Sequence, residues 1–161
     1  MSAADQSDAA LTGIRGWLLL VAIGVCLAPV RIGAEFIRGL RPLAPATWRA
    51  VTTPGTSVYH PLFGPLIVGE IVVNAALFIW ACALVYLFFA RRRAFPTAMI
   101  AFMIARVAAQ AVDTGLALMI PATAVRMGPE AYGALLSGVL VALVWVPYLV
   151  KSRRVALTFV R

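Results

Sequence analysis

Five polar side chains inside apolar stretches are the residues of this sequence that could do chemistry. Glu70 and Asn74 lie in one apolar run, and Arg106, Gln110 and Asp113 lie in another. A charged residue at the centre of a bilayer costs about 2.5–3.5 kcal/mol on insertion scales, so such groups must find partners inside the protein. These residue types suit a proton or substrate relay. They equally suit a buried polar network that fixes helix register.

The spacing of these residues places each set on one face of a helix. Glu70 and Asn74 are four residues apart, and Arg106, Gln110 and Asp113 follow at intervals of four and three. Because consecutive spans run antiparallel, the two faces can meet in the outer half of the bilayer. Arg106 is the closest to the centre, so we expect Gln110 and Asp113 to satisfy it. Glu70 must either pair with a neighbour or stay protonated.

The composition assigns the chain to the membrane class. Hydrophobic residues make up 63% of it and charged residues 12%, whereas soluble domains typically carry about 25% charged residues. We predict an all-α membrane protein, a four-helix transmembrane bundle formed by residues 14–150. The expected spans are 14–31, 65–90, 95–121 and 131–150, with a flexible polar tail at 1–13, a periplasmic loop at 32–64 and a basic cytoplasmic tail at 151–161. Continuation of the first span to Arg38 is the alternative for its end.

The distribution of positive charge predicts the orientation of the bundle. The net charge is +8, and the basic residues are more numerous in the segments that lie inside when both termini are cytoplasmic. Basic side chains near the inner leaflet are attracted to anionic lipid. The residues expected to contact lipid headgroups are Arg91, Arg92, Arg93, Lys151, Arg153 and Arg154. The tail that carries the last three is either a topology anchor or a partner-binding segment.

Small residues recur at fourfold spacing on the third and fourth spans. Such stripes let membrane helices approach closely. The expected helix-packing face consists of Ala101, Ala105, Ala109, Ala134, Gly138 and Ala142. It serves either packing within the bundle or docking of another membrane protein.

The sequence carries no set of residues typical of an enzyme or a metal site. It has no GxSxG, HExxH or phosphate-loop motif. Cys26 and Cys82 have no CxxC partner, and His60 is the one histidine. We therefore predict no catalytic residues, no metal and no cofactor. The basic residues sit at the ends of apolar runs, so nucleic acid is not an expected partner.

Several segments together resemble the domain of unknown function 2569 family, small bacterial inner-membrane proteins with four predicted helices. The matching segments are Gly13–Leu20, Tyr86–Phe89, Phe95-Pro96, Trp145–Tyr148, Ser152–Val155 and Thr158–Val160. The resemblance extends from Gly13 to Val160 and is weakest in the loop 31–57. Arg15 and Arg153 depart from the residues usual in the family but leave the match intact. The family implies topology and a multi-pass location in the bacterial inner membrane, and no mechanism.

We therefore predict a non-catalytic integral inner-membrane protein, an accessory or scaffold subunit that packs against a larger membrane complex. Its expected partners are the lipid bilayer and either a membrane protein or further copies of itself. The alternative is a small transporter or proton-linked carrier. In that case the polar cluster of Glu70, Asn74, Arg106, Gln110 and Asp113 between spans two and three would form the pathway.

Overall fold

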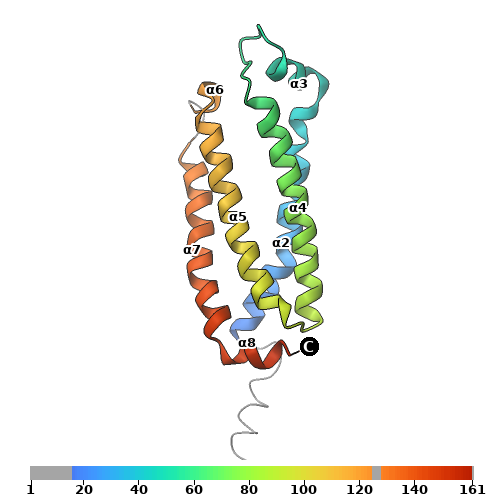
Figure 1. Ribbon diagram of the computed structural model, residues 1–161, viewed down its shortest axis with the longest axis vertical. Coiled ribbons are helices and arrows are strands. Elements are labelled where there is room, and N and C mark those ends of the chain that lie inside the picture. Colours follow the sequence, from blue (N-terminus) through green and yellow to red (C-terminus); the bar gives the residue numbers. More distant parts are fainter. Residues whose placement is uncertain (1–15, 125–127, 161) are drawn as a thin grey trace, which may run out of the picture.

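Four long helices run the length of the molecule (Figure 1). The computed structural model describes residues 16–124 and 128–160, which contain helices and no strands, so the expected tail at 1–13 lies outside the described residues. All four long helices are long and apolar enough to cross a membrane, in agreement with the predicted class. They are α2 (Trp17–Gly39), α4 (Phe63–Phe89), α5 (Ala94–Leu118) and α7 (Pro129–Lys151). The short elements are η1 (Arg41–Leu43), α3 (Pro45–Thr52), α6 (Pro121–Ala124) and α8 (Arg153–Thr158).

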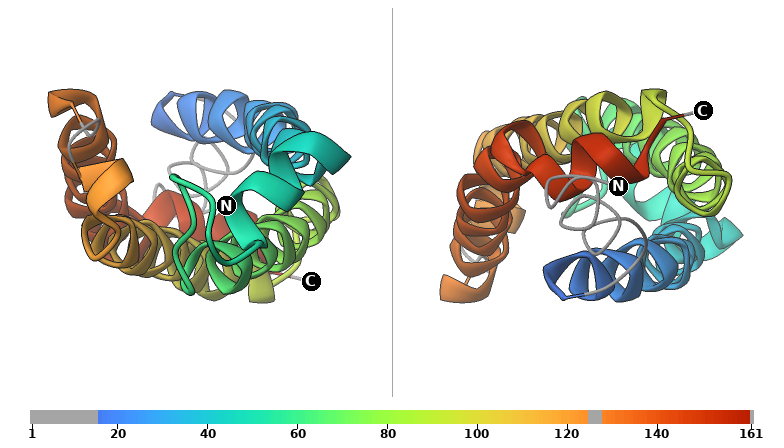
Figure 2. Two further views of the ribbon diagram at one scale, coloured as in Figure 1. Left: turned by 90° about the horizontal axis from the view of Figure 1, so that it is seen from above. Right: turned by 90° about the horizontal axis from the view of Figure 1, so that it is seen from below.

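Prolines and one serine set several of the helix boundaries. Pro45 and Pro129 stand in the first turns of α3 and α7, where the missing N–H costs no helical hydrogen bond. Ser152 has extended backbone between α7 and α8, and its hydroxyl oxygen accepts a hydrogen bond from the Val155 N–H at 3.4 Å. The chain therefore turns at Ser152, and α8 lies across the end of the bundle instead of continuing α7 (Figures 1 and 2).

The long helices follow one another around an open arc. α2 packs on α4, α4 on α5, and α5 on α7. α2 and α7 stand at the two ends of the arc and, over the described residues, are not a packed pair (Figure 2). Their contact is at one end, where the Trp17 and Trp145 rings are 6.4 Å apart. We call this end, which carries α8 and the α4–α5 turn, the α8 end, and the opposite end the α3 end.

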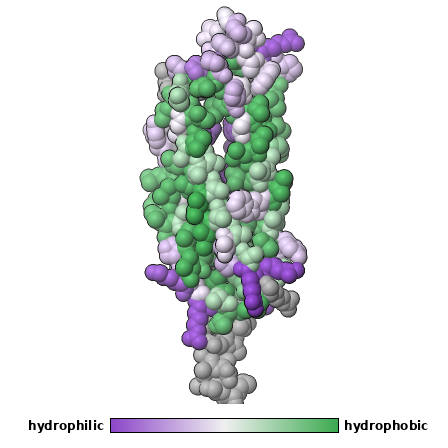
Figure 3. Space-filling view, viewed as in Figure 1, coloured by the Kyte–Doolittle hydropathy of each residue, from purple (hydrophilic) through white to green (hydrophobic). Residues whose placement is uncertain are grey.

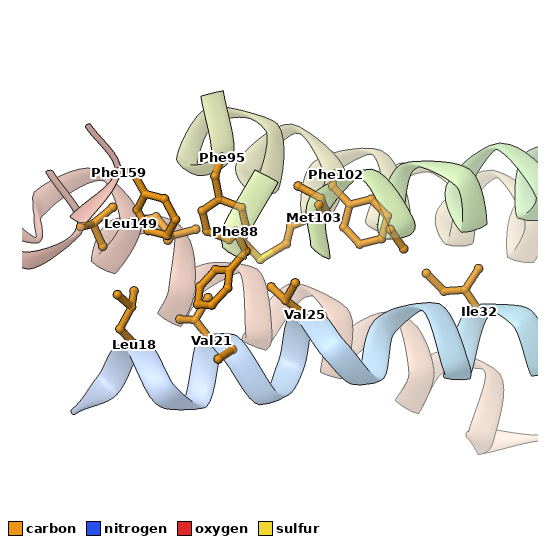
Figure 4. Packing of buried hydrophobic residues seen from close by; sticks show 14 of the residues in the cluster. Leu18, Val21, Val25, Ile32, Phe88, Phe95, Phe102, Met103, Leu149 and Phe159 are labelled. Carbon is orange, nitrogen blue, oxygen red and sulfur yellow. The ribbon is translucent and has the colours of Figure 1, made fainter. Parts of the chain in front are cut away.

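The hydrophobic core is concentrated at the α8 end (Figure 4). Phe159, which follows α8, stacks on Phe95 at 4.6 Å and lies 5.6 Å from Phe88. All three rings are buried, together with Leu18 of α2. The Arg93 Nε donates a hydrogen bond to the Val160 carbonyl at 2.7 Å. The segment after α7 therefore closes this end of the bundle from below.

Two segments differ from the expected division of the chain. α2 continues past Arg31 and stops at Gly39, close to the alternative end at Arg38. Ile32 is buried against the core, and the first proline beyond it is Pro42. The expected loop 32–64 therefore contains the last turns of a spanning helix as well as η1 and α3. In the expected basic tail, Val155 and Phe159 are packed in the core.

We expect Phe159→Ala to lower the stability of the protein markedly. Truncating a buried phenylalanine to alanine typically costs about 3–5 kcal/mol, and here it would also remove a ring that stacks on Phe95. Thermal unfolding in mild detergent measures the effect. Val160→Ala is the matched control, because that side chain is 49% exposed and its carbonyl remains available to Arg93. Equal melting temperatures for the two variants would contradict the proposed closure.

Candidate functional site

An ion pair between Glu35 and Arg106 joins α2 to α5. The Arg106 Nη2 lies 3.1 Å from each carboxylate oxygen of Glu35. Arg106 is equally far from the two ends of α5, and Glu35 lies in the last turns of α2. The side chains are 36% and 33% exposed, so the pair is not sealed inside the bundle. It satisfies the charge that most needs a partner at membrane depth.

Arg106 does not pair with the residues that its own helix offers. Gln110 donates its Nε2 hydrogen bond to the Thr114 hydroxyl at 3.4 Å, and Arg106 uses Glu35 instead of Asp113. Asp113 lies two turns further along α5, whereas Glu35 stands opposite on a neighbouring helix within direct reach. The expectation that Asp113 and Gln110 would satisfy Arg106 is therefore wrong.

The other predicted polar residues belong to the neighbouring helices α4 and α5: Glu70 and Asn74 to α4, and Asp113 to α5. Glu70 is exposed, and Asn74 and Asp113 are half-buried. The Glu70 and Asp113 carboxylates are close enough to interact electrostatically. Glu70 also approaches the end of α2, because its Oε1 lies 3.9 Å from where a Cβ at Gly39 would stand. Figure 3 shows hydrophilic side chains in a hollow near the α3 end, framed by apolar surface.

A groove of about 400 Å³ lies between α2, α5 and α7, on the open side of the arc. Most of its lining is apolar. Its polar lining residues are Arg31, Glu35, Arg106, Gln110 and Ser137. Two arginines against one glutamate leave the groove with an excess of positive charge. The predicted cluster is therefore divided: Arg106 and Gln110 face the groove, while Glu70, Asn74 and Asp113 are not part of its lining.

Several predicted small residues lie at the contact between α5 and α7. A Cβ at Gly138 would meet the Val107 Cγ2 of α5 at 3.5 Å, so Gly138 faces α5. Ala109 and Ala142 pack against the core. Ala134 lines the groove, Ala105 is half-buried and Ala101 is exposed.

The basic residues expected to contact headgroups gather at the α8 end. Arg91 is exposed in the α4–α5 turn, with a positive φ of 51°, and Lys151 and Arg153 are exposed. Arg92 and Arg93 are exposed and hydrogen-bonded to Tyr86 and Val160 respectively. Arg154 is half-buried, and its Nη1 has no hydrogen-bond partner among the described residues.

Sequence reasoning missed Glu35 and Arg31 because both were placed at the edge of a loop. A signal was nevertheless present. Arg31 and Glu35 are four residues apart and flank the buried Ile32, which is the spacing of a continuing helix. A lone arginine in the middle of a span also demands an acid from another helix. Among the described residues, no group of three or more His, Cys, Asp and Glu is placed to hold a metal ion.

A double-mutant cycle on Glu35 and Arg106 should give a coupling energy on the order of 1 kcal/mol, because removing either partner leaves the other unpaired. The variants are Glu35→Gln, Arg106→Gln and the combination, measured by reversible unfolding in detergent. The same cycle with Asp113→Asn and Arg106→Gln is the control and should give a coupling near zero. A larger coupling energy for Asp113 and Arg106 than for Glu35 and Arg106 would show that Glu35 is not the principal partner of Arg106.

Comparison with known proteins identifies the family. The family described as "Protein of unknown function (DUF2569)" matches residues 11–160, which include all four long helices and the segment that closes the α8 end. No curated protein and no solved structure matches the chain. The resemblance of the first span and of the Trp145–Val160 stretch is thereby confirmed: the chain belongs to the DUF2569 family, and its four candidate spans indicate a multi-pass membrane protein.

Proposed function

We propose that the protein is a non-catalytic accessory or scaffold subunit of a larger complex in the bacterial inner membrane. The observation that carries this proposal is the open arc. α7 packs along one side, on α5, and is the least buried of the four spans. Self-contained four-helix bundles enclose their core with all four helices. A helix attached to one neighbour leaves most of its circumference available to another protein.

The face of α7 that points away from α5 has the pattern of a helix-packing surface. Its exposed large residues are Tyr132, Leu136, Leu140, Leu143 and Val150, and we call this set the α7 row. From Leu136 onward the intervals of four, three and seven residues follow the heptad spacing of left-handed helix pairs, and Tyr132 lies one further turn before Leu136. Gly138, which faces α5, lies nearly opposite Leu136 and Leu140 around the helix. The small residues are thus used inside the bundle, and the α7 row is free for a partner.

The positive charge supports an orientation with the α8 end in the cytoplasm. Arg91, Arg92, Arg93, Lys151 and Arg153 lie at that end and are exposed. Lysine and arginine are enriched on the cytoplasmic side of membrane proteins. Both ends of the four-span unit then lie inside.

Purification in gentle detergent should bring down one other membrane protein in stoichiometric amount, identified by mass spectrometry. The combined variant Leu140→Trp and Leu143→Trp should lose that partner, because the bulky rings would disrupt close packing on the α7 row while remaining compatible with lipid. Ile79→Trp is the matched control, since Ile79 on α4 is 68% exposed and lies outside the α7 row. An unaccompanied wild-type protein, or a partner retained by the double variant, would contradict the proposal.

A small carrier is the second candidate function, and the ion pair beside the groove favours it. Midplane sites with paired charges are typical of membrane transporters. In this case proteoliposomes should dissipate a pH gradient faster than empty vesicles, and Glu35→Gln and Arg106→Gln, at the ion pair beside the groove, should slow the dissipation at equal amounts of reconstituted protein. If the protein is an accessory subunit, vesicles that contain the wild type or either variant should dissipate the gradient at the same rate as empty vesicles.

A further inference from the structure

We propose that the groove between α2 and α7 binds one anionic lipid of the surrounding bilayer. Its headgroup would lie at Arg31 and Arg106, and one acyl chain would lie along the apolar part of the groove. This site goes beyond the accessory role and does not depend on it, because the α7 row is a different face of α7.

Two of the three helices that line the groove, α2 and α5, change from apolar to polar in the same direction. On α2, Leu20 and Val21 come first and Arg31 and Glu35 last. On α5, Met99, Phe102 and Met103 precede Arg106 and Gln110. α7 runs the opposite way and contributes one polar lining residue, Ser137, between Leu135 towards the α3 end and Trp145 towards the α8 end. The groove is therefore amphipathic along its length, as an amphipathic ligand requires.

The charged end of the groove has hydrogen-bond donors to spare. Both contacts of Arg106 with Glu35 use Nη2, so Nε and Nη1 remain for a second acceptor. Arg31 lines the groove and has no hydrogen bond or ion pair to any described residue. An anionic group could accept hydrogen bonds from both guanidinium groups while the ion pair stays intact. Phosphate oxygens suit such donors well.

The depth of the arginines is compatible with a headgroup. Arg31 lies eight residues before the end of α2 at Gly39, which corresponds to roughly 12 Å along the helix axis. Long arginine side chains extend towards the interface. Glu35, one turn closer to that end, holds the Arg106 guanidinium in the same direction. The lipid phosphate would therefore lie below its usual level, by roughly 12 Å less the reach of the arginine side chains.

The size of the groove favours a lipid chain over a helix of another protein. Its volume is about 400 Å³, within the range of roughly 300–1,000 Å³ that holds one small ligand. A spanning helix about 10 Å wide and 30 Å long occupies roughly 2,000 Å³ or more. A partner helix could cover the mouth of the groove but could not occupy it.

Native mass spectrometry of the detergent-purified protein tests the site. Phosphatidylglycerol and phosphatidylethanolamine are added in equal amounts, and the bound lipids are counted. Gly24 lines the groove, and a Cβ there meets nothing within 4 Å, so Gly24→Phe should fill the groove and remove one bound phosphatidylglycerol. Gly69→Phe is the matched control, because Gly69 on α4 is equally open and lies outside the lining. Gly24→Leu is a smaller obstruction that keeps the test decisive if the phenylalanine disturbs folding.

The headgroup contact is tested separately with Arg31→Gln, which should reduce the preference for phosphatidylglycerol over phosphatidylethanolamine about fivefold. Arg38→Gln is its control, because Arg38 lies near the same end, outside the groove, and bonds the Ala34 carbonyl. The proposal is overturned if the Gly24 variants keep the wild-type lipid count. It is also overturned if Arg31→Gln leaves the preference unchanged, or if a partner protein proves to displace the lipid.

Discussion

The charge of Arg106, halfway along α5, is the constraint on which the arrangement of the helices depends. A guanidinium at this depth is tolerated only with a partner, and Glu35 supplies it from α2. α2 and α5 are not neighbours around the arc, because α4 packs between them. The pair therefore links helices that the packing alone does not join, and it holds them at a distance that leaves the groove open on the α7 side.

The two halves of the bundle are stabilised by different forces. At the α8 end, three phenylalanine rings and the aliphatic side chains of α2 form a closed apolar core. At the α3 end, charged and amide groups of α2, α4 and α5 take the place of that core. Any ligand or partner therefore meets closely packed apolar residues at one end and polar groups at the other. The groove lies along the boundary between the two.

The four spans could be predicted from the sequence because each is a long, predominantly apolar run between prolines or arginines, with few polar residues inside it. The sequence leaves the end of the first span open between Arg31 and Arg38, since Arg31 and Glu35 look like interface residues when each is considered alone. The choice of Glu35 as the partner of Arg106 depends on α2 continuing beyond them. The packing of Phe159 could not be predicted either. Its contacts are with Phe88 and Phe95, which precede it by more than one helix in the sequence, with α7 in between. The absence of packing between α2 and α7 could not be predicted either, because it leaves no local pattern in the sequence.

The aromatic closure of the α8 end also imposes an order on the biogenesis of the protein. Phe88 and Phe95 are synthesised before the rest of α5 and before α7, whereas Phe159 follows α7. At roughly 5–20 residues per second, the first two rings wait several seconds for the third. During that interval the α4–α5 turn presents unpaired aromatic surface at the membrane interface. Insertion factors that shield such surface have this interval in which to act, and it ends when the segment after α7 docks.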